Sequence, residues 1–123
     1  MRFKLLFFSI VLCKLISAQV YSGLPFNFSH GLTIDSLFVA DSGALSDIDL
    51  KISMSSTSYI RLLRLVLISP SETPITLFDG ILDGTTLYQT IFDDSANTVI
   101  TDGSPPYIGR YRPIESFSPI IGN

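Results

Sequence analysis

The stretch from Thr90 to Pro113 reads T-I-F-D-D-S-A-N-T-V-I-T-D-G-S-P-P-Y-I-G-R-Y-R-P. It contains an acidic pair (Asp93, Asp94), a short β-branched run (Thr98–Thr101), a turn-rich cluster and a Gly-Arg-Tyr-Arg-Pro pentad. Runs of β-branched residues favour strands, and Asp, Gly and Pro favour turns. We therefore expect a bend between two strands, with polar side chains folded back on the turn and the arginines of the pentad close enough to pair with the aspartates.

Outside this stretch, short strand patterns are separated by turn residues. Ile48–Met54 alternates apolar and polar residues, and Leu32–Val39 resembles a half-buried strand. Further strands are expected at Ile75–Phe78, Thr86–Phe92, Asn97–Thr101 and Phe117–Ile121. Short, regularly spaced strands without an amphipathic helix predict an all-β protein, a jelly-roll-like antiparallel β-sandwich.

One apolar segment is ambiguous. The spacing of Arg61 and Arg64 within Tyr59–Ile68 is compatible with a helix that carries both arginines on one side. A serine-rich break precedes this segment and Ser69-Pro70-Ser71 ends it, which favours a strand.

The first residues have the pattern of a secretory signal peptide. Arg2 and Lys4 supply a basic region, Leu5–Leu12 supplies a short apolar region, and small residues precede an expected cleavage between Ala18 and Gln19. The alternative is an uncleaved N-terminal anchor. We thus divide the chain into a signal peptide (1–18), a lead-in loop (19–31) and a sandwich domain (32–123), and expect a secreted protein that is not held in a membrane after cleavage.

Composition limits the possible partners. Three of the eight lysines and arginines lie in residues 1–18, so five remain against eleven acidic residues, a net charge of −6. Such a domain disfavours nucleic acid, whose phosphates need basic side chains, and is compatible with calcium. Cys13 is the only cysteine, so a cleaved domain has no disulfide. Asn27-Phe28-Ser29 is an N-glycosylation sequon at Asn27.

The sequence has few of the residues that a hydrolase active site requires. His30 is the only histidine, no Gly-x-Ser-x-Gly motif is present, and zinc lacks its usual ligands. Asp41-Ser42-Gly43 resembles the surroundings of a catalytic aspartate in aspartic and subtilisin-like proteases. The first class needs a second such aspartate, and the second needs a histidine and a serine after it. We interpret this tripeptide as a turn, and the protein as non-enzymatic.

Three aspartates are candidates for a calcium site. Asp93, Asp94 and Asp102 lie close together in the sequence, although their spacing is not that of an EF-hand loop. The competing interpretation is that one aspartate accepts backbone N–H bonds in the bend while the other is solvated. No other cofactor is expected.

Four motifs in order are similar to those of a known module. They are Asp41-Ser42-Gly43, then Ile68–Thr73 (I-S-P-S-E-T), then Phe92–Ala96 (F-D-D-S-A), and finally Gly109–Pro113 (G-R-Y-R-P). Together they resemble the P domain, also called the Homo B domain, which follows the catalytic domain in kexin, furin and other subtilisin-like proteases. The resemblance extends from about Leu32 to Asn123.

The chain departs from that pattern in three places. Thr57–Leu63 stands where the family has His-Thr-Tyr-x-Gly-Asp-Leu, and Glu72 stands where the family has a turn glycine. If Glu72 has a positive φ, it costs about 1 kcal/mol or more. The family's Trp-containing strand region is not found, so we expect a sandwich that lacks its last strands.

The resemblance implies a non-catalytic module. It would pack on the catalytic domain of a subtilisin-like serine endopeptidase, in cis or in trans, and stabilise or regulate proteolysis. The alternative is a stand-alone secreted β-sandwich that binds calcium, a glycan or a cell surface.

Overall fold

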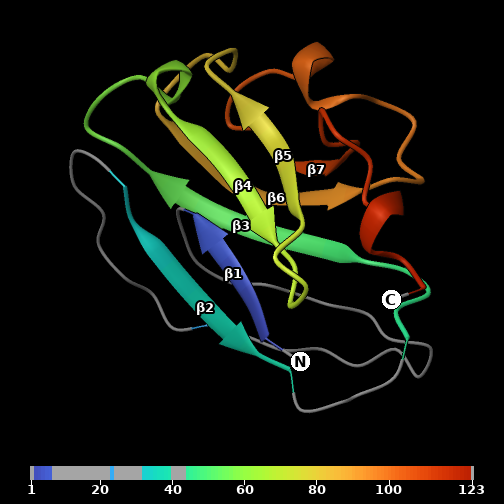
Figure 1. Ribbon diagram of the computed structural model, residues 1–123. Coiled ribbons are helices and arrows are strands. Elements are labelled where there is room, and N and C mark those ends of the chain that lie inside the picture. The colour runs from blue at the N-terminus through green and yellow to red at the C-terminus, as the bar shows by residue number, and fades with distance from the viewer. Residues whose placement is uncertain (1, 7–22, 24–31, 40–43, 123) are drawn as a thin grey trace.

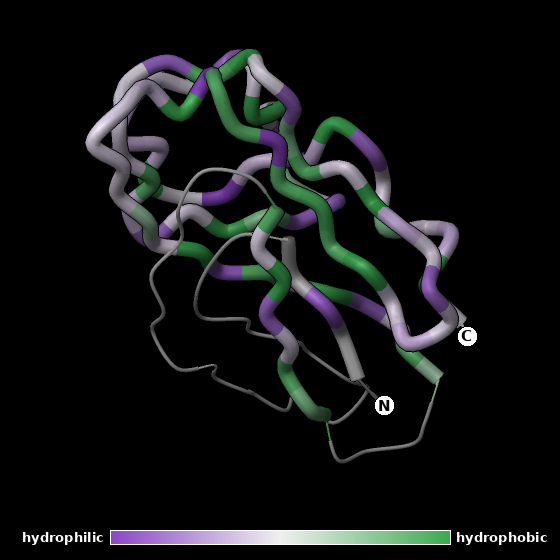
Figure 2. The backbone as a smooth tube through the Cα atoms, turned by 60° about the vertical axis from the view of Figure 1, so that its left-hand side comes forward, coloured by the Kyte–Doolittle hydropathy of each residue, from purple (hydrophilic) through white to green (hydrophobic). Residues whose placement is uncertain are grey.

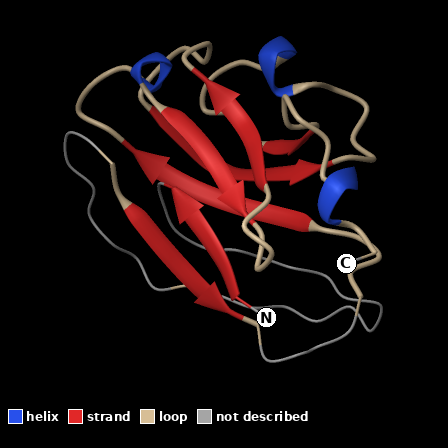
Figure 3. Cartoon of the chain, in the orientation of Figure 1, coloured by secondary structure: helices blue, strands red, loops and turns tan. Residues whose placement is uncertain are grey.

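The computed structural model describes residues 2–6, 23, 32–39 and 44–122, and these form strands and short 3₁₀ helices without an α-helix (Figures 1 and 3). The strands are β1 (Arg2–Leu6), β2 (Ile34–Phe38), β3 (Asp49–Ser55), β4 (Arg64–Ile68), β5 (Pro74–Asp79), β6 (Thr86–Asp93) and β7 (Gly109–Tyr111). The 3₁₀ helices are η1 (Ile60–Leu62), η2 (Ile100–Asp102) and η3 (Ser118–Ile120). The prediction of an all-β fold is therefore confirmed.

The strands form two sheets. One has the order β2-β1-β4-β5 with antiparallel neighbours, and the other has the order β3-β6-β7. Figure 1 shows β4 and β5 crossing over β3 and β6 at an angle. In the second sheet β3 is antiparallel to β6, but β7 is parallel to it, which departs from the expected antiparallel arrangement. The connection through residues 94–108 is long enough to return the chain in the same direction.

The core lies between the two sheets and draws on both. Leu50, Ile52 and Phe92 from one sheet and Leu67 and Leu77 from the other are almost fully buried and belong to one cluster. Figure 2 shows hydrophobic residues recurring along the strands. Burial of each such side chain stabilises the fold by about 1.5–3 kcal/mol. The alternation predicted for Ile48–Met54 is confirmed, since its apolar members all point into this core.

A bulge interrupts the pairing of β3 with β6. Ile52 pairs with Thr90, but Met54 pairs with Leu87, so β6 carries one extra residue. Gln89 absorbs it with a φ of +49°, and its N–H donates to Ser53 Oγ across 2.8 Å. Bulges of this kind bend a strand and increase its twist.

The strand expected at Tyr59–Ile68 is only half correct. Its second part is β4, but its first part is η1, where Leu63 N–H donates to Ile60 O. Ile60 is buried and its N–H donates to Gly84 O. The guanidinium of Arg61 lies over the ring of Tyr59, 4.6 Å from its centroid. The chain therefore turns here to bring Ile60 into the core before β4 begins.

Two other expected strands are wrong. Asn97–Thr101 contributes only an isolated bridge at Val99 and then enters η2, in which Asp102 N–H donates to Val99 O. Phe117–Ile121 forms η3, which brings Phe117 and Ile120 into the core as a 3₁₀ turn does and an alternating strand does not.

The N-terminal residues expected to be a signal peptide include a strand. β1 pairs with β2 over five residue pairs and with β4 over three. The expected cleavage point at Ala18 and Gln19 lies outside the described residues, as do Cys13, Asn27, His30 and Asp41-Ser42-Gly43. In the described part of the chain, no helix is long and apolar enough to cross a membrane.

Candidate functional site

Three charged side chains, Asp49, Asp93 and Arg110, form an ion cluster. These residues come from β3, β6 and β7, and Asp49 pairs directly with Asp93. Arg110 Nη1 donates to Asp49 Oδ2 across 2.9 Å and to Asp93 Oδ2 across 2.7 Å. The neighbours of the aspartates in each strand, Leu50 and Phe92, face the core, so the cluster lies on the opposite face of the sheet.

Both carboxylates of the ion cluster are buried. The side chains of Asp49 and Asp93 are 8% and 6% exposed, while that of Arg110 is 47% exposed. A buried carboxylate is costly unless it is paired and hydrogen-bonded. The guanidinium meets that requirement for two carboxylates at once, and these hydrogen bonds raise the pKa of Arg110 above its ordinary value. The expected pairing of the pentad with the acidic pair is confirmed for Arg110 and Asp93.

Asp93 also closes the turn that follows β6. Its Oδ1 accepts from Ser95 N–H across 2.8 Å and from Ser95 Oγ across 2.6 Å, and Ala96 N–H donates to its carbonyl. Burial raises the pKa of Asp93, but the hydrogen bonds from Ser95 and Arg110 outweigh it, and the pKa lies below that of an ordinary aspartate. The expected folding of polar side chains back onto the bend is confirmed.

Asp94 and Asp102 are not part of the ion cluster. Asp94 Oδ2 accepts from Ser116 Oγ across 2.8 Å and from Phe117 N–H across 2.9 Å, which fixes the entry to η3. Asp102 is exposed at the end of η2. The trio expected to bind calcium, Asp93, Asp94 and Asp102, is therefore not among the groups of converging carboxylates found in the described part of the chain.

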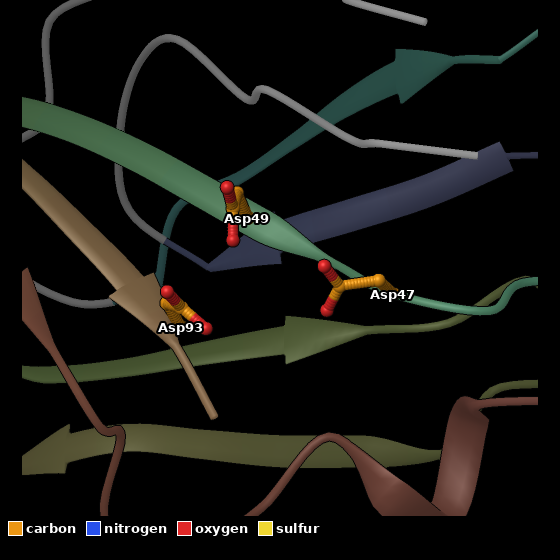
Figure 4. Close-up of side chains that lie close together, drawn as sticks. All are labelled: Asp47, Asp49 and Asp93. Carbon is orange, nitrogen blue, oxygen red and sulfur yellow. The ribbon is translucent and has the colours of Figure 1, made fainter. Parts of the chain in front are cut away.

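A different acidic trio does converge. Asp47, Asp49 and Asp93 each place a carboxylate oxygen within 4.8 Å of the others (Figure 4). Asp47 is exposed and its Oδ1 accepts from Ile48 N–H. Arg110 already supplies a positive charge within hydrogen-bond distance of two of the three carboxylates. A calcium ion placed among them would be repelled by the guanidinium, so the residues do not fit calcium as they stand.

Sequence reasoning missed Asp47 and Asp49 as neighbours of Asp93. The alternation of Ile48–Met54 places Asp49 on the polar face of its strand, which is correct, but the burial of Asp49 depends on β6 and β7. The signal that could have found it is the pairing register, since Asp49 begins β3 and Asp93 ends β6, and the two strands are antiparallel. Register depends on partners far apart in the sequence, which no local pattern specifies.

Next to the ion cluster, the loop before β7 is held by Tyr107. This residue is buried with a φ of +57°; its hydroxyl accepts from Asp83 N–H across 2.9 Å, and its carbonyl accepts from Thr90 Oγ1 across 2.7 Å. Its ring meets that of Tyr111 edge to face, with centroids 6.3 Å apart. Burial raises the pKa of Tyr107. The bond from Thr90 holds Tyr107 against β6, two residues before β7 begins.

Comparisons with known proteins give no match: no family model, no curated protein and no solved structure is similar to this chain.

Proposed function

We propose that the protein is a secreted, non-catalytic P-domain-like module that packs on a subtilisin-like serine endopeptidase and stabilises or regulates it. The observation that carries this proposal is the ion cluster. Arg110 of the G-R-Y-R-P segment pairs with Asp93 of the F-D-D-S-A segment, so the two motifs most typical of the resemblance meet in space.

The role of the motif residues supports a structural module. Asp93 and Asp94 accept hydrogen bonds that fix the turn after β6 and the entry to η3, and Arg110 joins three strands. A general acid or base needs a free proton position near a substrate. The carboxylates of Asp93 and Asp94 are instead occupied by neighbours within the domain, which favours a supporting role over chemistry.

The test uses a kexin-type catalytic domain deprived of its own P domain. Its thermal inactivation half-life is measured alone, with this protein, and with the Arg110→Ala variant. The proposal expects a longer half-life with the wild-type protein and a smaller effect with the variant. An unchanged half-life, together with no serine protease labelled by a fluorophosphonate probe in material co-captured with the secreted protein, would refute it.

The stand-alone binding module remains the alternative, and one observation favours it. Leu32, Ile34 and Phe38 are all more than half exposed, and Ile34 and Phe38 lie on the same face of β2. Apolar side chains aligned in this way are typical of interaction surfaces. A secreted protein recovered without a protease, yet bound to cells or glycan arrays through this face, would favour the alternative.

A further inference from the structure

β1 lies inside the four-stranded sheet, between β2 and β4, and runs antiparallel to both. The N–H and C=O groups of such a strand are divided between its two neighbours. Without β1, the facing edges of β2 and β4 would lose their pairing partner. Edges of this kind readily accept another strand.

The same residues begin the pattern of a secretory signal peptide. Arg2 and Lys4 form its basic region, and the cleavage expected between Ala18 and Gln19 would remove β1 with it. The strand that fills the position between β2 and β4 is therefore one that secretion would take away. The buried core cluster includes residues of β3, β4, β5 and β6, which cleavage would leave in the chain.

A carboxylate lies beside the position between β2 and β4. Lys4, at the centre of β1, lies opposite Ser36 of β2 and Ile68 of β4. Its Nζ lies 3.5 Å from Oε1 of Glu72, which belongs to the turn between β4 and β5. An extended segment that enters this position in the orientation of β1 therefore meets a carboxylate with its central residue, which favours lysine or arginine there.

The rest of the chain offers no free segment of that kind. Residues 19–47 contain no lysine or arginine. The remaining basic residues lie in β3, η1, β4 and β7 or in the bridge to Val99, and they are Lys51, Arg61, Arg64, Arg110 and Arg112. A second copy would have to break its own sheets to donate a basic strand, so the occupant is a different protein.

We infer that, once residues 1–18 are removed, the position between β2 and β4 is an acceptor site for an extended segment of a partner protein, antiparallel to both strands and with a lysine or arginine at its centre. Main-chain hydrogen bonds would supply the affinity and Glu72 the preference for a basic residue. This inference rests on the proposed function, in which secretion removes the signal peptide and a protease chain is the partner.

The first experiment uses the protein as a secretory host delivers it. Mass spectrometry defines its first residue, and calorimetry measures binding of the synthetic peptide acetyl-Arg-Phe-Lys-Leu-Leu-amide. We expect a protein that begins at Gln19 and binds the peptide, whereas the full chain, purified from a cytoplasmic host, binds at least about tenfold more weakly because β1 occupies the site. A secreted protein that still begins at Met1, or equal binding to both forms, would overturn the inference.

Charge reversal tests the role of Glu72. A peptide with glutamate in place of its lysine should bind about threefold more weakly, the size of effect expected for an exposed ion pair. The Glu72→Lys variant should reverse that preference. Binding that is insensitive to both changes would rule out the proposed orientation.

A second design covers the case in which the cleaved protein does not fold. Leu5→Pro in the full chain removes the N–H of the residue that pairs with Asp35 of β2 and Leu67 of β4, and so disfavours the pairing of β1. Leu5→Ala keeps the N–H and is the control. We expect the Leu5→Pro variant to bind the peptide and the Leu5→Ala variant not to bind it. If neither variant binds the peptide, the inference is overturned. Peptide binding without stabilisation of the protease would refute the proposed function but support the acceptor site. Stabilisation of the protease without peptide binding would support the proposed function but refute the acceptor site.

Discussion

Arg110 Nη1 lies 2.7 Å from Asp93 Oδ2, and this contact joins the two segments that define the sequence pattern of the protein. Asp49 shares the same guanidinium nitrogen. One half-exposed cation therefore compensates two buried anions, and the three strands of the smaller sheet are held together on their outer face. The first three predictions concern this cluster.

Arg110→Ala should reduce the free energy of unfolding by about 3 kcal/mol, because removal of the cation leaves two buried carboxylates uncompensated. Arg112→Ala is the matched control. Arg112 is exposed two residues later in the chain, and the backbone hydrogen bonds of this position do not depend on its side chain, so its loss should fall within about 0.5 kcal/mol. Urea unfolding followed by circular dichroism measures both, and equal losses would contradict the assigned role.

Acid should destabilise the wild-type protein through Asp93. Its pKa in the folded state lies below the unperturbed 3.8, so its contribution is present above that pH and is lost as the pH falls through the folded-state pKa. Urea unfolding at a series of pH values below neutrality should show a smaller loss of stability in Asp93→Asn than in the wild-type protein. Asp79→Asn, at an exposed position, is the control and should behave like the wild type.

Calcium should leave the unfolding temperature of the wild-type protein unchanged at millimolar concentrations. Arg110→Ala should become calcium-dependent, because it removes the repelling charge from the Asp47, Asp49 and Asp93 trio. A ligand that binds only the folded state raises stability according to its concentration relative to Kd. Thermal scans with calcium and with a chelator measure the effect, and stabilisation of the wild type would show that the guanidinium does not block the ion.

Glu72→Gly should raise the free energy of unfolding by roughly 0.5–1 kcal/mol. Glu72 has a φ of +63°, a left-handed conformation that strains a residue with a Cβ. Its contact with Lys4 is exposed and contributes little. The reverse substitution is the control: Gly80 has a φ of +65°, so Gly80→Ala should destabilise by about 1 kcal/mol. A loss of stability in Glu72→Gly would mean that the turn depends on the glutamate side chain.

Gly103→Ala should cost about 1–3 kcal/mol through overpacking. A Cβ at this position would lie 2.7 Å from Tyr111 Cε1 and 3.0 Å from Tyr107 Cδ1, so the edge-to-face tyrosine pair would have to shift. Near-ultraviolet circular dichroism of the tyrosines and the urea midpoint should both change. Gly23→Ala is the control, since a Cβ there has open space, and an equally large effect at that position would reject the packing argument.

The sequence predicts those parts of the fold that depend on local pattern. The alternation of Ile48–Met54 yields β3, and the turn residues around Pro74 and Asp79 bound β5. The positive φ expected if Glu72 kept the turn of the resembling family is present. In the first two cases neighbouring residues specify the geometry, and in the third the expectation follows from the resemblance.

The errors arise where distant contacts decide the outcome. Ile60 and Ile120 enter the core from 3₁₀ helices, although their apolar surroundings favoured strands. The ion cluster was predicted in part, since Arg110 was expected to pair with the acidic pair, but Asp49 joins it through a strand pairing that local pattern does not specify. Tertiary packing overrides local propensity at these positions.

The ion cluster also has a consequence for synthesis. Asp49 leaves the ribosome 61 positions before the arginine that neutralises it. At the usual elongation rate of about 5–20 residues per second, the chain waits several seconds with β3 made and its counter-charge missing. The ion cluster can therefore form only after β7 has been synthesised, so the smaller sheet is completed late in translation.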